Sequence, residues 1–320
     1  MTDTDAVAPV PFIVGCIRSG TTLLRSMLGS HPDLAIPPEA RFISHLHRVH
    51  GHGAVDVERF VTDLYRDDRF ELWQLDEAAV RDALRAAAPL DFSGAIRCVY
   101  RCYAATVGKP RYGNKTPRYV RDIPLLHAVL PEARFVHLVR DGRDVARAIA
   151  DAPFGPSTLS TAAMLWDHDV RAGIDAGRAL PDGWYHQVRY EDLVADPRRV
   201  MTALCEAMAL PFDEAVLDPS EESRRAAGAV RHPDAHVNVQ RPLTAGLRDW
   251  RVDLADHDVA LVEALAWRAL DAAGYERRHA PLPLGARARA LECRASISVR
   301  RAGTSVRRRA GLARARLAGR

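Results

Sequence analysis

Short apolar runs alternate along this chain with stretches in which apolar residues recur at helical spacing. Three runs, at 12–14, 134–139 and 184–188, predict buried strands. A turn and then a helical pattern follow each of them. Strands that alternate with helices favour a parallel sheet with right-handed crossover connections. The pattern therefore predicts an α/β fold, a parallel sheet flanked by helices.

A mainly helical stretch, residues 39–107, separates the first strand and helix from the rest of this alternation. Apolar positions recur there every three or four residues, as in Phe42, Leu46 and Val49. We predict a single domain over residues 1–280 with a helical insertion at about 39–107. Residues 218–246 mix Pro, Gly and polar residues, which predicts a long surface segment. Residues 111–117 are predicted to form a short polar turn.

The turn after the first strand has the composition of an anion-binding loop. A strand, a glycine-bounded turn and a helix together point backbone N–H groups and a positive helix end at an anion. The candidate ligand-binding residues are Arg18, Ser19, Gly20, Thr21 and Thr22. The spacing from Gly15 to Gly20 matches the P-loop of ATP- and GTP-binding proteins, but Thr21 stands where that loop has lysine. The sheet is therefore predicted to be P-loop-like, with a different phosphate-bearing ligand, unless Ser and Thr merely cap the helix.

A second turn, residues 140–144, follows the strand at 134–139 and holds two arginines and two aspartates. Ligands of open α/β sheets lie at such strand ends, and arginine can grip a phosphate there with two hydrogen bonds. We assign Arg140 to the ligand. Pairing with Asp141 and Asp144 is the alternative, above all for Arg143. Tyr190, after the third strand, either provides an aromatic wall for a base or begins a helix.

Two further residues are candidates for chemistry. Lys115 is one of only two lysines in a chain with 45 Lys and Arg residues together. A loop that lacks its own lysine still needs a cation over the transferred group, which Lys115 can supply as a compact charge. Glu39 can accept a proton from an acceptor hydroxyl if partial burial raises its pKa. Its alternative role is to favour the dipole of a helix that begins there.

Composition bears on the size of the core, on disulfide and metal sites and on the cellular location. Apolar residues make up 48% of the chain, enough for a sizeable core, and five scattered cysteines suggest neither a disulfide framework nor a zinc site. Four histidines at 45–52 have poor spacing for one helix face, so a solvated surface is expected rather than a metal site. No signal peptide and no apolar run of about 20 residues is present. We expect a cytoplasmic protein.

The C-terminal segment, residues 281–320, is strongly basic. From 285 to 320 it holds eleven arginines, no lysine and one acid, a net charge of +10 in a chain whose total is +4. It is either a solvated, partly helical appendage or a segment that contacts acidic lipid or nucleic acid by charge alone. Interleaved aromatic residues are absent, so we expect no specific nucleic-acid partner.

Together these segments resemble the sulfotransferase superfamily that uses 3′-phosphoadenosine 5′-phosphosulfate (PAPS), over about residues 11–250. Residues 17–24 look like the 5′-phosphosulfate loop of that family, and residues 135–144 look like its 3′-phosphate strand and turn. Three further segments look like the bacterial branch and its tyrosylprotein-sulfotransferase relatives: 112–117, 188–193 and 248–250. The motifs follow the order of the family.

The resemblance implies a role for each candidate. Residues 18–22 would cradle the 5′-phosphosulfate, Arg140 would hold the 3′-phosphate, and Tyr190 and Arg248 would also belong to the donor site. Glu39 would be the base, and Lys115 would stabilise the sulfuryl group and the leaving oxygen. The family often has a serine eight residues after the arginine of its 3′-phosphate turn. Counted from Arg140, that position is Ala148 in this chain. Either Arg147 compensates for the missing hydroxyl or the affinity for the donor is lower.

The sequence thus predicts a sulfotransferase that moves a sulfuryl group from PAPS to a hydroxyl acceptor. No metal is expected, because a sulfuryl group carries less charge than a phosphoryl group. Small-metabolite, lipid, sugar and peptide hydroxyls are all compatible acceptors. Two alternatives stay open. One is a P-loop-type kinase, which Thr21 disfavours, and the other is a non-catalytic nucleotide-binding protein, if Ala148 marks decay of the donor site.

Overall fold

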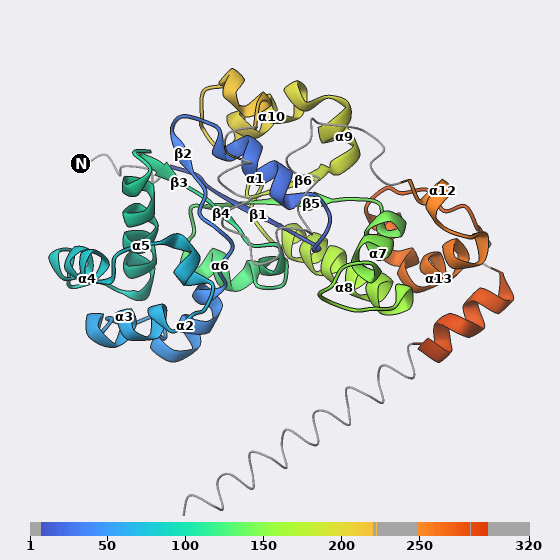
Figure 1. Cartoon of the computed structure of the whole chain (residues 1–320), viewed down its shortest axis with the longest axis horizontal. Helices are drawn as coiled ribbons and strands as arrows, with labels where there is room; N and C mark the ends of the chain where they lie inside the picture. Colours follow the sequence, from blue (N-terminus) through green and yellow to red (C-terminus); the bar gives the residue numbers. More distant parts are fainter. Residues whose placement is uncertain (1–7, 220–221, 223–248, 282, 294–320) are drawn as a thin grey trace, which may run out of the picture. The chain divides into compact units, whose positions relative to one another are not determined.

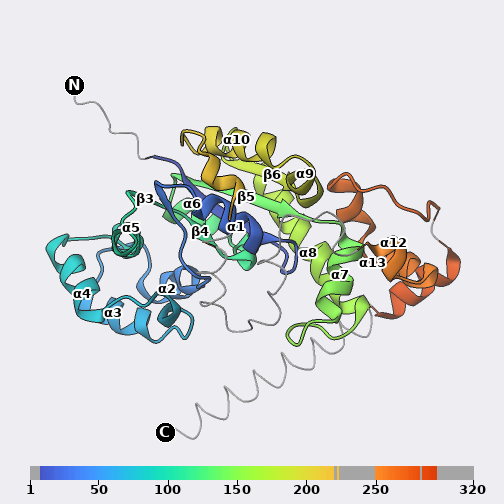
Figure 2. The same cartoon turned by 45° about the horizontal axis from the view of Figure 1, so that its top comes forward.

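The computed structural model describes residues 8–219, 222, 249–281 and 283–293 of the 320-residue chain. A four-stranded parallel sheet lies at its centre, in the order β4-β1-β5-β6. Its strands are β1 (Val10–Gly15), β4 (Asn114–Lys115), β5 (Ala133–Val139) and β6 (Tyr185–Arg189). The longest pairing joins β1 to β5 (Figure 2). The predicted α/β fold is confirmed, and the three predicted strands are β1, β5 and β6.

Helices cover the sheet, as Figure 1 shows. The labelled α-helices are α1 (Thr21–Gly29), α2 (Phe42–His50), α3 (Val57–Tyr65), α4 (Glu77–Ala86), α5 (Phe92–Thr106), α6 (Ile123–Val129), α7 (Gly142–Ala150), α8 (Leu159–Arg178), α9 (Tyr190–Ala195), α10 (Pro197–Ala207), α12 (Trp250–Asp253) and α13 (Asp256–Ala272). Residues 284–293 form a further helix. Three short 3-10 helices are η1 (Phe70–Trp73), η2 (Pro117–Arg121) and η3 (Glu214–Leu217).

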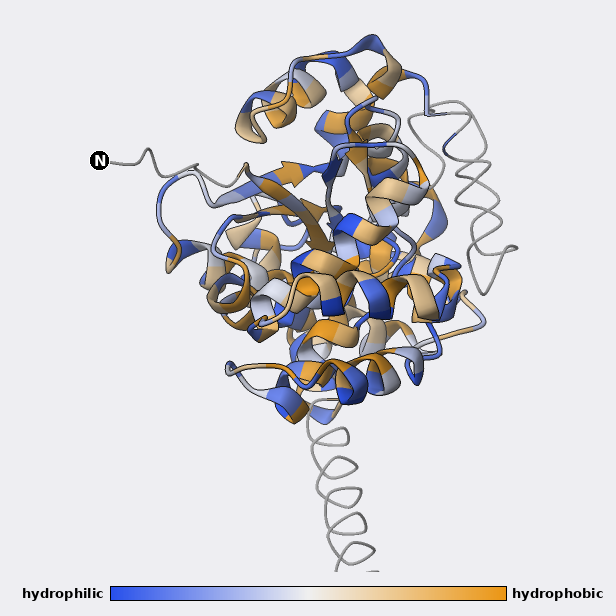
Figure 3. Ribbon diagram, turned by 90° about the vertical axis from the view of Figure 1, so that its left-hand side faces the viewer, coloured by the Kyte–Doolittle hydropathy of each residue, from blue (hydrophilic) through white to orange (hydrophobic). Residues whose placement is uncertain are grey.

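The strands bury both faces, so their side chains divide between two apolar clusters. Phe12 of β1 and Phe135 of β5 belong to one cluster, with residues of α2, α5 and α6. Ile13 and Val136, their neighbours in sequence, belong to the other, with residues of α1, α9 and α10. This alternation follows from the period of two along a strand. The strands are accordingly coloured as hydrophobic in the interior of the ribbon in Figure 3.

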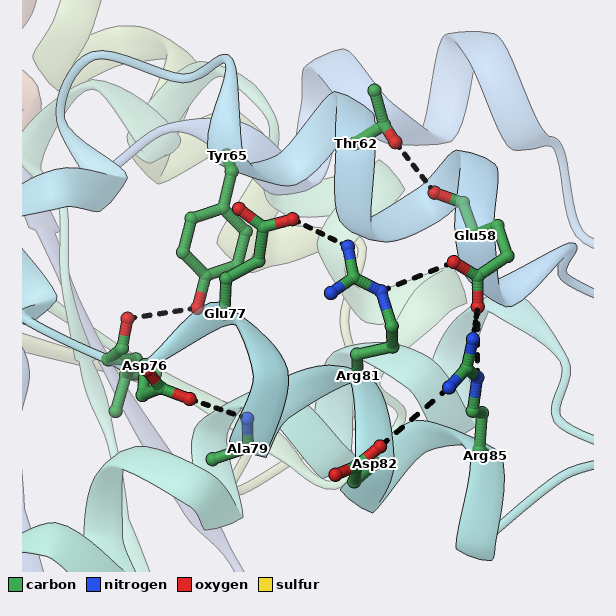
Figure 4. A network of polar contacts seen from close by, with 10 residues as sticks. Glu58, Thr62, Tyr65, Asp76, Glu77, Ala79, Arg81, Asp82 and Arg85 are labelled. Atoms are coloured by element: carbon green, nitrogen blue, oxygen red, sulfur yellow. Dashed lines mark hydrogen bonds and ion pairs between the residues drawn. The ribbon is translucent and has the colours of Figure 1, made fainter.

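The predicted helical insertion is present as α2, α3, η1, α4 and α5. In Figure 2 these helices lie beside one another, and α3 packs on α4 and α4 on α5. Phe42, Phe70, Trp73 and Tyr100 form the aromatic centre of the insertion, with ring centroids of neighbouring pairs between 5.0 and 6.1 Å apart. A network of charged side chains covers its outer surface on α3 and α4 (Figure 4).

Two segments predicted to be turns have regular structure instead. Residues 111–117 form β3 (Arg111–Tyr112) and β4, and β3 pairs with β2 (Leu34–Ala35) in a small second sheet. The segment is polar in sequence, yet residues 112–117 are buried because β4 is hydrogen bonded along the edge of β1. The turn expected after the third strand is instead the first part of α9, so Tyr190 begins a helix, which was one of the two roles predicted for it.

The described residues fall into two compact units. The first contains residues up to 141 and from 168 onward to the end of η3, and it includes the whole four-stranded sheet and the insertion. The second contains residues 142–167 and the described residues from 249 onward. The predicted domain over 1–280 stays a prediction. None of the helices in the described ranges is both long and apolar enough to cross a membrane.

Candidate functional site

The loop between β1 and α1 has a backbone that few residues other than glycine can adopt. Gly20 has a φ of 96°, and a Cβ added there would lie 2.5 Å from the ring of Tyr190. Arg18, two positions earlier, also has a positive φ of 68°. Residues in this conformation turn successive N–H groups toward one side of the loop, which forms an anion-binding concavity. The loop therefore requires Gly20 both for its conformation and for the close approach of Tyr190.

Helix α1 begins without a side-chain cap, as α2, α6, α9 and α13 also do. Helices α3, α4, α5 and α10 each begin after an aspartate whose side chain accepts a hydrogen bond from the backbone N–H three residues later. The N-cap of α1 is Gly20, with no side-chain cap and no acid in the first turn. Ser19 and the two threonines therefore do not cap this helix, contrary to the alternative interpretation of the sequence. The N–H of Leu23 already donates to the carbonyl of Gly20 at 3.0 Å, so the N–H groups that the helix offers to an anion are those of Thr21 and Thr22.

Ser19 adds a second sign of a ligand at this loop. Its side chain is only 1% exposed, and its hydroxyl has no hydrogen-bond partner among the described residues. A buried polar atom without a partner costs free energy, about 1–3 kcal/mol, unless something else pairs with it. An oxyanion bound by the N–H groups of the loop would provide that partner.

The second predicted turn, which begins with Arg140, contacts the loop between β1 and α1 through Tyr190. The guanidinium of Arg140 lies 4.7 Å from the centre of the Tyr190 ring, the ring that packs on Gly20. The next residue is anchored as well, because the N–H of Asp141 donates to Oε1 of Glu191 at 3.0 Å. Three predicted site residues, Gly20, Arg140 and Tyr190, are thus in one place in the first unit.

Arg143 has a structural role in the second unit. Its guanidinium donates to Oε1 of Glu263 at 2.7 Å, and both side chains are almost fully buried. It also lies 3.7 Å from the ring centre of Trp250, whose backbone N–H donates to Asp144. The sequence suggested Asp141 and Asp144 as partners of Arg143, and the structure adds the carboxylate of Glu263 on α13. Such a distant partner leaves no local signal.

Glu39 and Lys115 come together although 76 positions separate them. The Nζ atom of Lys115 lies 3.3 Å from Oε2 of Glu39, and the side chain of Lys115 is only 6% exposed. Lys115 is fixed by β4, where it pairs in register with Ile13, two residues before the end of β1. The pair therefore lies beside the strand that leads into the anion-binding loop.

Three side chains donate hydrogen bonds to the backbone segment that carries Glu39. Arg25 of α1 donates to the carbonyl of Ile36, with Nη2 at 2.8 Å. Trp73 donates from Nε1 to the carbonyl of Pro38 at 2.9 Å. Thr116, next to Lys115, donates from its hydroxyl to the carbonyl of Ala40 at 2.9 Å. Residues from α1, η1 and the end of β4 thus hold Glu39 in place.

The charges around Glu39 reverse the expected direction of its pKa. Burial raises the pKa of Glu39, but the positive charges of Lys115 and Arg69 outweigh that effect, and the net pKa lies below its usual value. The condition stated for Glu39 as a base, a pKa raised by partial burial, is therefore not met in this structure, because the cations more than offset the effect of burial. Burial also lowers the pKa of Lys115, and the neighbouring Glu39 offsets this only in part. Glu39 is therefore a carboxylate at neutral pH.

Arg69 and Arg25 are part of the site, and the sequence did not single them out. Nη1 of Arg69 donates to Oε1 of Glu39 at 2.7 Å, opposite the oxygen that faces Lys115. Arg69 lies just before η1, in a polar stretch without a motif. Arg25 is buried at 4% exposure within α1. An arginine beside Leu24, Met27 and Leu28 was the one available signal, since a buried charge needs a partner.

Several other predictions concern residues away from these contacts. Ala148 is buried in α7 of the second unit. Arg248 and most of 218–246 lie outside the described residues, as does the basic segment after 293. Among the histidines, His47 and His52 contact each other at 3.0 Å, but His50 is not solvated as expected, because it is buried beside Asp63 at 3.2 Å. Within the described ranges no three His, Cys, Asp or Glu side chains form a metal-binding group.

The sequence of the chain is similar to those of known proteins. A model described as the sulfotransferase family matches residues 9–214. Protein-tyrosine sulfotransferase 1 of Danio rerio is 28% identical over 69% of this chain and 58% of its own length. Nodulation protein NoeE of Sinorhizobium fredii is 31% identical over 60% of this chain and 48% of its own. The chain thus spans about half the length of these curated relatives.

A solved structure has the same fold over most of its length. The sulfotransferase domain of the Synechococcus PCC 7002 olefin synthase is 26% identical, with a TM-score of 0.58. The match covers 83% of this chain and 93% of that domain. The parallel sheet and its flanking helices are thus those of a sulfotransferase domain.

Proposed function

The chain belongs to the sulfotransferase family, and on that premise we propose that it moves a sulfuryl group from PAPS to a hydroxyl of an acceptor. The observation that carries the proposal is the contact between the buried Lys115 and the half-buried Glu39, 3.3 Å apart, beside the strand that leads into an uncapped helix. A cation and a carboxylate in contact next to an anion-binding loop provide the two charges that such a transfer needs. One stabilises the leaving oxygen and the other removes the proton.

The residues of the first unit fit the donor. The free N–H groups at the start of α1 and the buried hydroxyl of Ser19 suit the 5′-phosphosulfate, which accepts hydrogen bonds but donates none. Arg18, Thr21 and Thr22 complete this loop. Arg140 would hold the 3′-phosphate, and Tyr190, which packs on Gly20, lies between the two. Arg248 is also proposed to bind the donor. PAPS supplies an activated sulfuryl group, so the chain itself has only to orient it and to handle charge and proton.

In the transfer the acceptor oxygen forms a new S–O bond while the S–O bond to the donor phosphate breaks. The acceptor proton passes to Glu39, and the electron pair of the broken bond stays on the phosphate oxygen, whose charge Lys115 neutralises. The low pKa of Glu39 keeps it ionised before the reaction. As Lys115 turns its charge to the leaving oxygen, Glu39 loses one of its two cations and its pKa rises. Glu39 thereby becomes a stronger base when the proton moves.

The first test asks whether the donor binds. We expect saturable calorimetric binding of the desulfated donor, 3′-phosphoadenosine 5′-phosphate, at micromolar concentration. Absence of saturable binding in that range would contradict the proposed donor site. Mg²⁺-dependent consumption of ATP, without sulfuryl transfer, would instead show a kinase.

The second test identifies the acceptor. The protein is incubated with ³⁵S-labelled PAPS and a cell extract, and the labelled product is isolated. Glu39→Gln should lower the labelling by about 10²-fold, because a general base contributes at least that much. Glu58→Gln makes the same chemical change on the exposed surface of α3 and serves as the matched control. Equal labelling by the two variants would exclude Glu39 as the base.

A further inference from the structure

The second lysine of the chain, Lys109, has an unusual set of partners. It follows α5 and is half-buried, and its backbone N–H donates to the carbonyl of Ala104 at the end of that helix, at 3.0 Å. An ammonium has three N–H donors and can therefore bond to three acceptors at once. The ammonium of Lys109 donates to three backbone carbonyls, those of Gly29, His31 and Leu34.

These carbonyls belong to two different elements. Gly29 is the last residue of α1, where carbonyls lack partners within the helix and carry partial negative charge. A lysine often caps a helix end of this kind. Leu34, however, begins β2, beyond the helix. Lys109 thus joins the end of α1 to the segment that leads to Glu39, which capping alone does not require.

From Lys109 onward, residues 109–116 run parallel to residues 29–40, and we call this pair of segments the ladder. Lys109 contacts residues 29–34 at one end of it, and Lys115 contacts Glu39 near the other. The two lysines of the chain therefore lie at opposite ends of one structure. Hydrogen bonds join the segments between them, from Arg111 to Asp33, from Gly113 to Ala35 and from Thr116 to Ala40.

The register of the ladder decides where Glu39 lies. A shift by one residue turns every side chain of an extended segment to the opposite face. Such a shift would move Glu39 away from Lys115. The strands β2 and β3 have only two residues each, so they offer few side chains that could fix the register themselves. Lys109 supplies a fixed point, because its own backbone is bonded to the end of α5.

We propose that Lys109 is a positioning residue for the transfer, which fixes the register of the ladder and with it the place of Glu39 beside Lys115. The inference rests on the proposed role of Glu39 as the base. Lys109 lies at the C-terminal end of α1, whereas the anion-binding loop lies at the N-terminal end. The nine residues of α1 separate the two ends by about 13 Å. Loss of Lys109 should therefore disturb the base and spare the binding of the donor.

The first measurement needs no acceptor. Titration of the Glu39 carboxyl by ¹³C NMR, with its signal identified by its absence in Glu39→Gln, gives the pKa in the parent and in Lys109→Met. Burial raises this pKa, and the charges of Lys115, Arg69 and Arg41 together hold it below its usual value. A ladder that can slip weakens these contacts, so the pKa of Glu39 should rise in Lys109→Met.

Arg48→Met is the matched control for this titration. Nε of Arg48 also donates to a backbone carbonyl, that of Ser44 at 3.1 Å, but on the exposed surface of α2. The substitution thus removes a cation and a hydrogen bond to the backbone away from the ladder. The pKa of Glu39 should stay at its parental value in this variant.

The second measurement separates the base from the donor. Lys109→Met should lower the labelling of a cell extract with ³⁵S-labelled PAPS by about tenfold at neutral pH, because a displaced base reacts less often. The acid limb of the pH profile should move to higher pH with the pKa of Glu39. Calorimetric affinity for 3′-phosphoadenosine 5′-phosphate should stay as in the parent.

Two results would overturn the proposal. One is a parental pKa of Glu39 in folded Lys109→Met, and the other is an equal loss of labelling and donor affinity, which would show that Lys109 only stabilises α1. If Lys109→Met does not fold, Lys109→Gln keeps two N–H donors without the charge, and the same rise in pKa is required of it. A raised pKa in a protein whose parent transfers no sulfuryl group would reject the proposed function but keep Lys109 as the residue that positions Glu39.

Discussion

The charged network of Figure 4 and the group around Glu39 use the same residue types in different surroundings. In the network, Glu58 of α3 forms ion pairs with two arginines of α4. Its Oε2 atom lies 3.2 Å from Nε of Arg81, and its Oε1 atom lies 2.7 Å from Nη2 of Arg85. The side chain of Glu58 is 56% exposed. Water and salt screen charges in such positions, and exposed pairs of this kind contribute little to stability.

The group at Glu39 has a similar geometry, with Lys115 at 3.3 Å and Arg69 at 2.7 Å, but it lies against the sheet. Here the pKa of the carboxylate and that of the lysine both move below their usual values. Similar distances therefore have different consequences, because burial and not contact decides how strongly one charge influences another. The network only links the exposed surfaces of α3 and α4, whereas the charges around Glu39 can respond to a reaction.

The largest effect should come from removing the buried cation. Lys115→Ala should lower turnover with PAPS by about 10²-fold or more, because the leaving oxygen then lacks its counter-charge. Steady-state kinetics with the labelled donor measure this. Lys115→Met, which keeps most of the volume of the side chain, should show the same loss. Turnover within about threefold of the parent would mean that the assigned role is wrong.

A test of donor binding distinguishes chemistry from folding in these variants. The desulfated product lacks the transferred group, so its affinity should fall much less than turnover does in Lys115→Met. A parallel collapse of thermal stability and affinity would show that Lys115 is needed for the structure of β4 instead.

The pH profile should show the shifted pKa values directly. The reaction needs Glu39 ionised and Lys115 protonated, so turnover should be bell-shaped in pH. Since the pKa of Glu39 is lowered, the acid limb should lie below the usual range of glutamate. Since the pKa of Lys115 is lowered as well, the alkaline limb should lie below that of an ordinary lysine. In Lys115→Met the alkaline limb assigned to Lys115 should disappear, and its persistence would contradict the assignment.

Arg69→Gln should have a smaller effect with a distinct signature. The loss of a positive charge beside Glu39 raises the pKa of that carboxylate, so the acid limb should move to higher pH. The same loss removes a charge that lowers the pKa of Lys115, so the alkaline limb should also move to higher pH. We expect turnover at neutral pH to fall by about tenfold, because Arg69 no longer donates to the carboxylate of Glu39 and so no longer fixes its position. A profile with both limbs unmoved would show that Arg69 does not act through Glu39.

The sequence predicts the anion-binding loop better than the group at Glu39, and the difference is physical. The loop is local, because its glycines, hydroxyls and following helix are adjacent in the chain. Lys115 was found because lysine is rare here, and Glu39 was assigned as the base through a family resemblance. Arg69 lies 30 residues from Glu39 in a polar stretch, and only the folded insertion brings the two together. The lowered pKa of Glu39 was missed because its contacts with Lys115 and Arg69 both form only on folding.

The polar segment at 111–117 shows a second limit of prediction from the sequence. Its Gly, Asn, Lys and Thr residues predict a turn, since such residues favour turns. In the structure the N–H of Thr116 donates to the carbonyl of Ile13, and β4 lies buried along β1. Buried strands are usually recognised by their apolar residues, and this polar strand lacks them. Its last residue is Lys115. Patterns of this kind fail where a functional residue replaces an apolar one.

Arg81→Ala should have the smallest effect, and it tests whether exposure separates the two groups. The hydrogen bond to Glu77 raises the pKa of Arg81 further, and the guanidinium is charged at any accessible pH. Its loss should leave turnover within about twofold and the melting temperature within about 2 °C of the parent, because water replaces both carboxylate contacts. A fall in turnover as large as that of Arg69→Gln would break the comparison. It would mean that α4 transmits strain to the site and that the insertion cannot be treated as a passive support for Glu39.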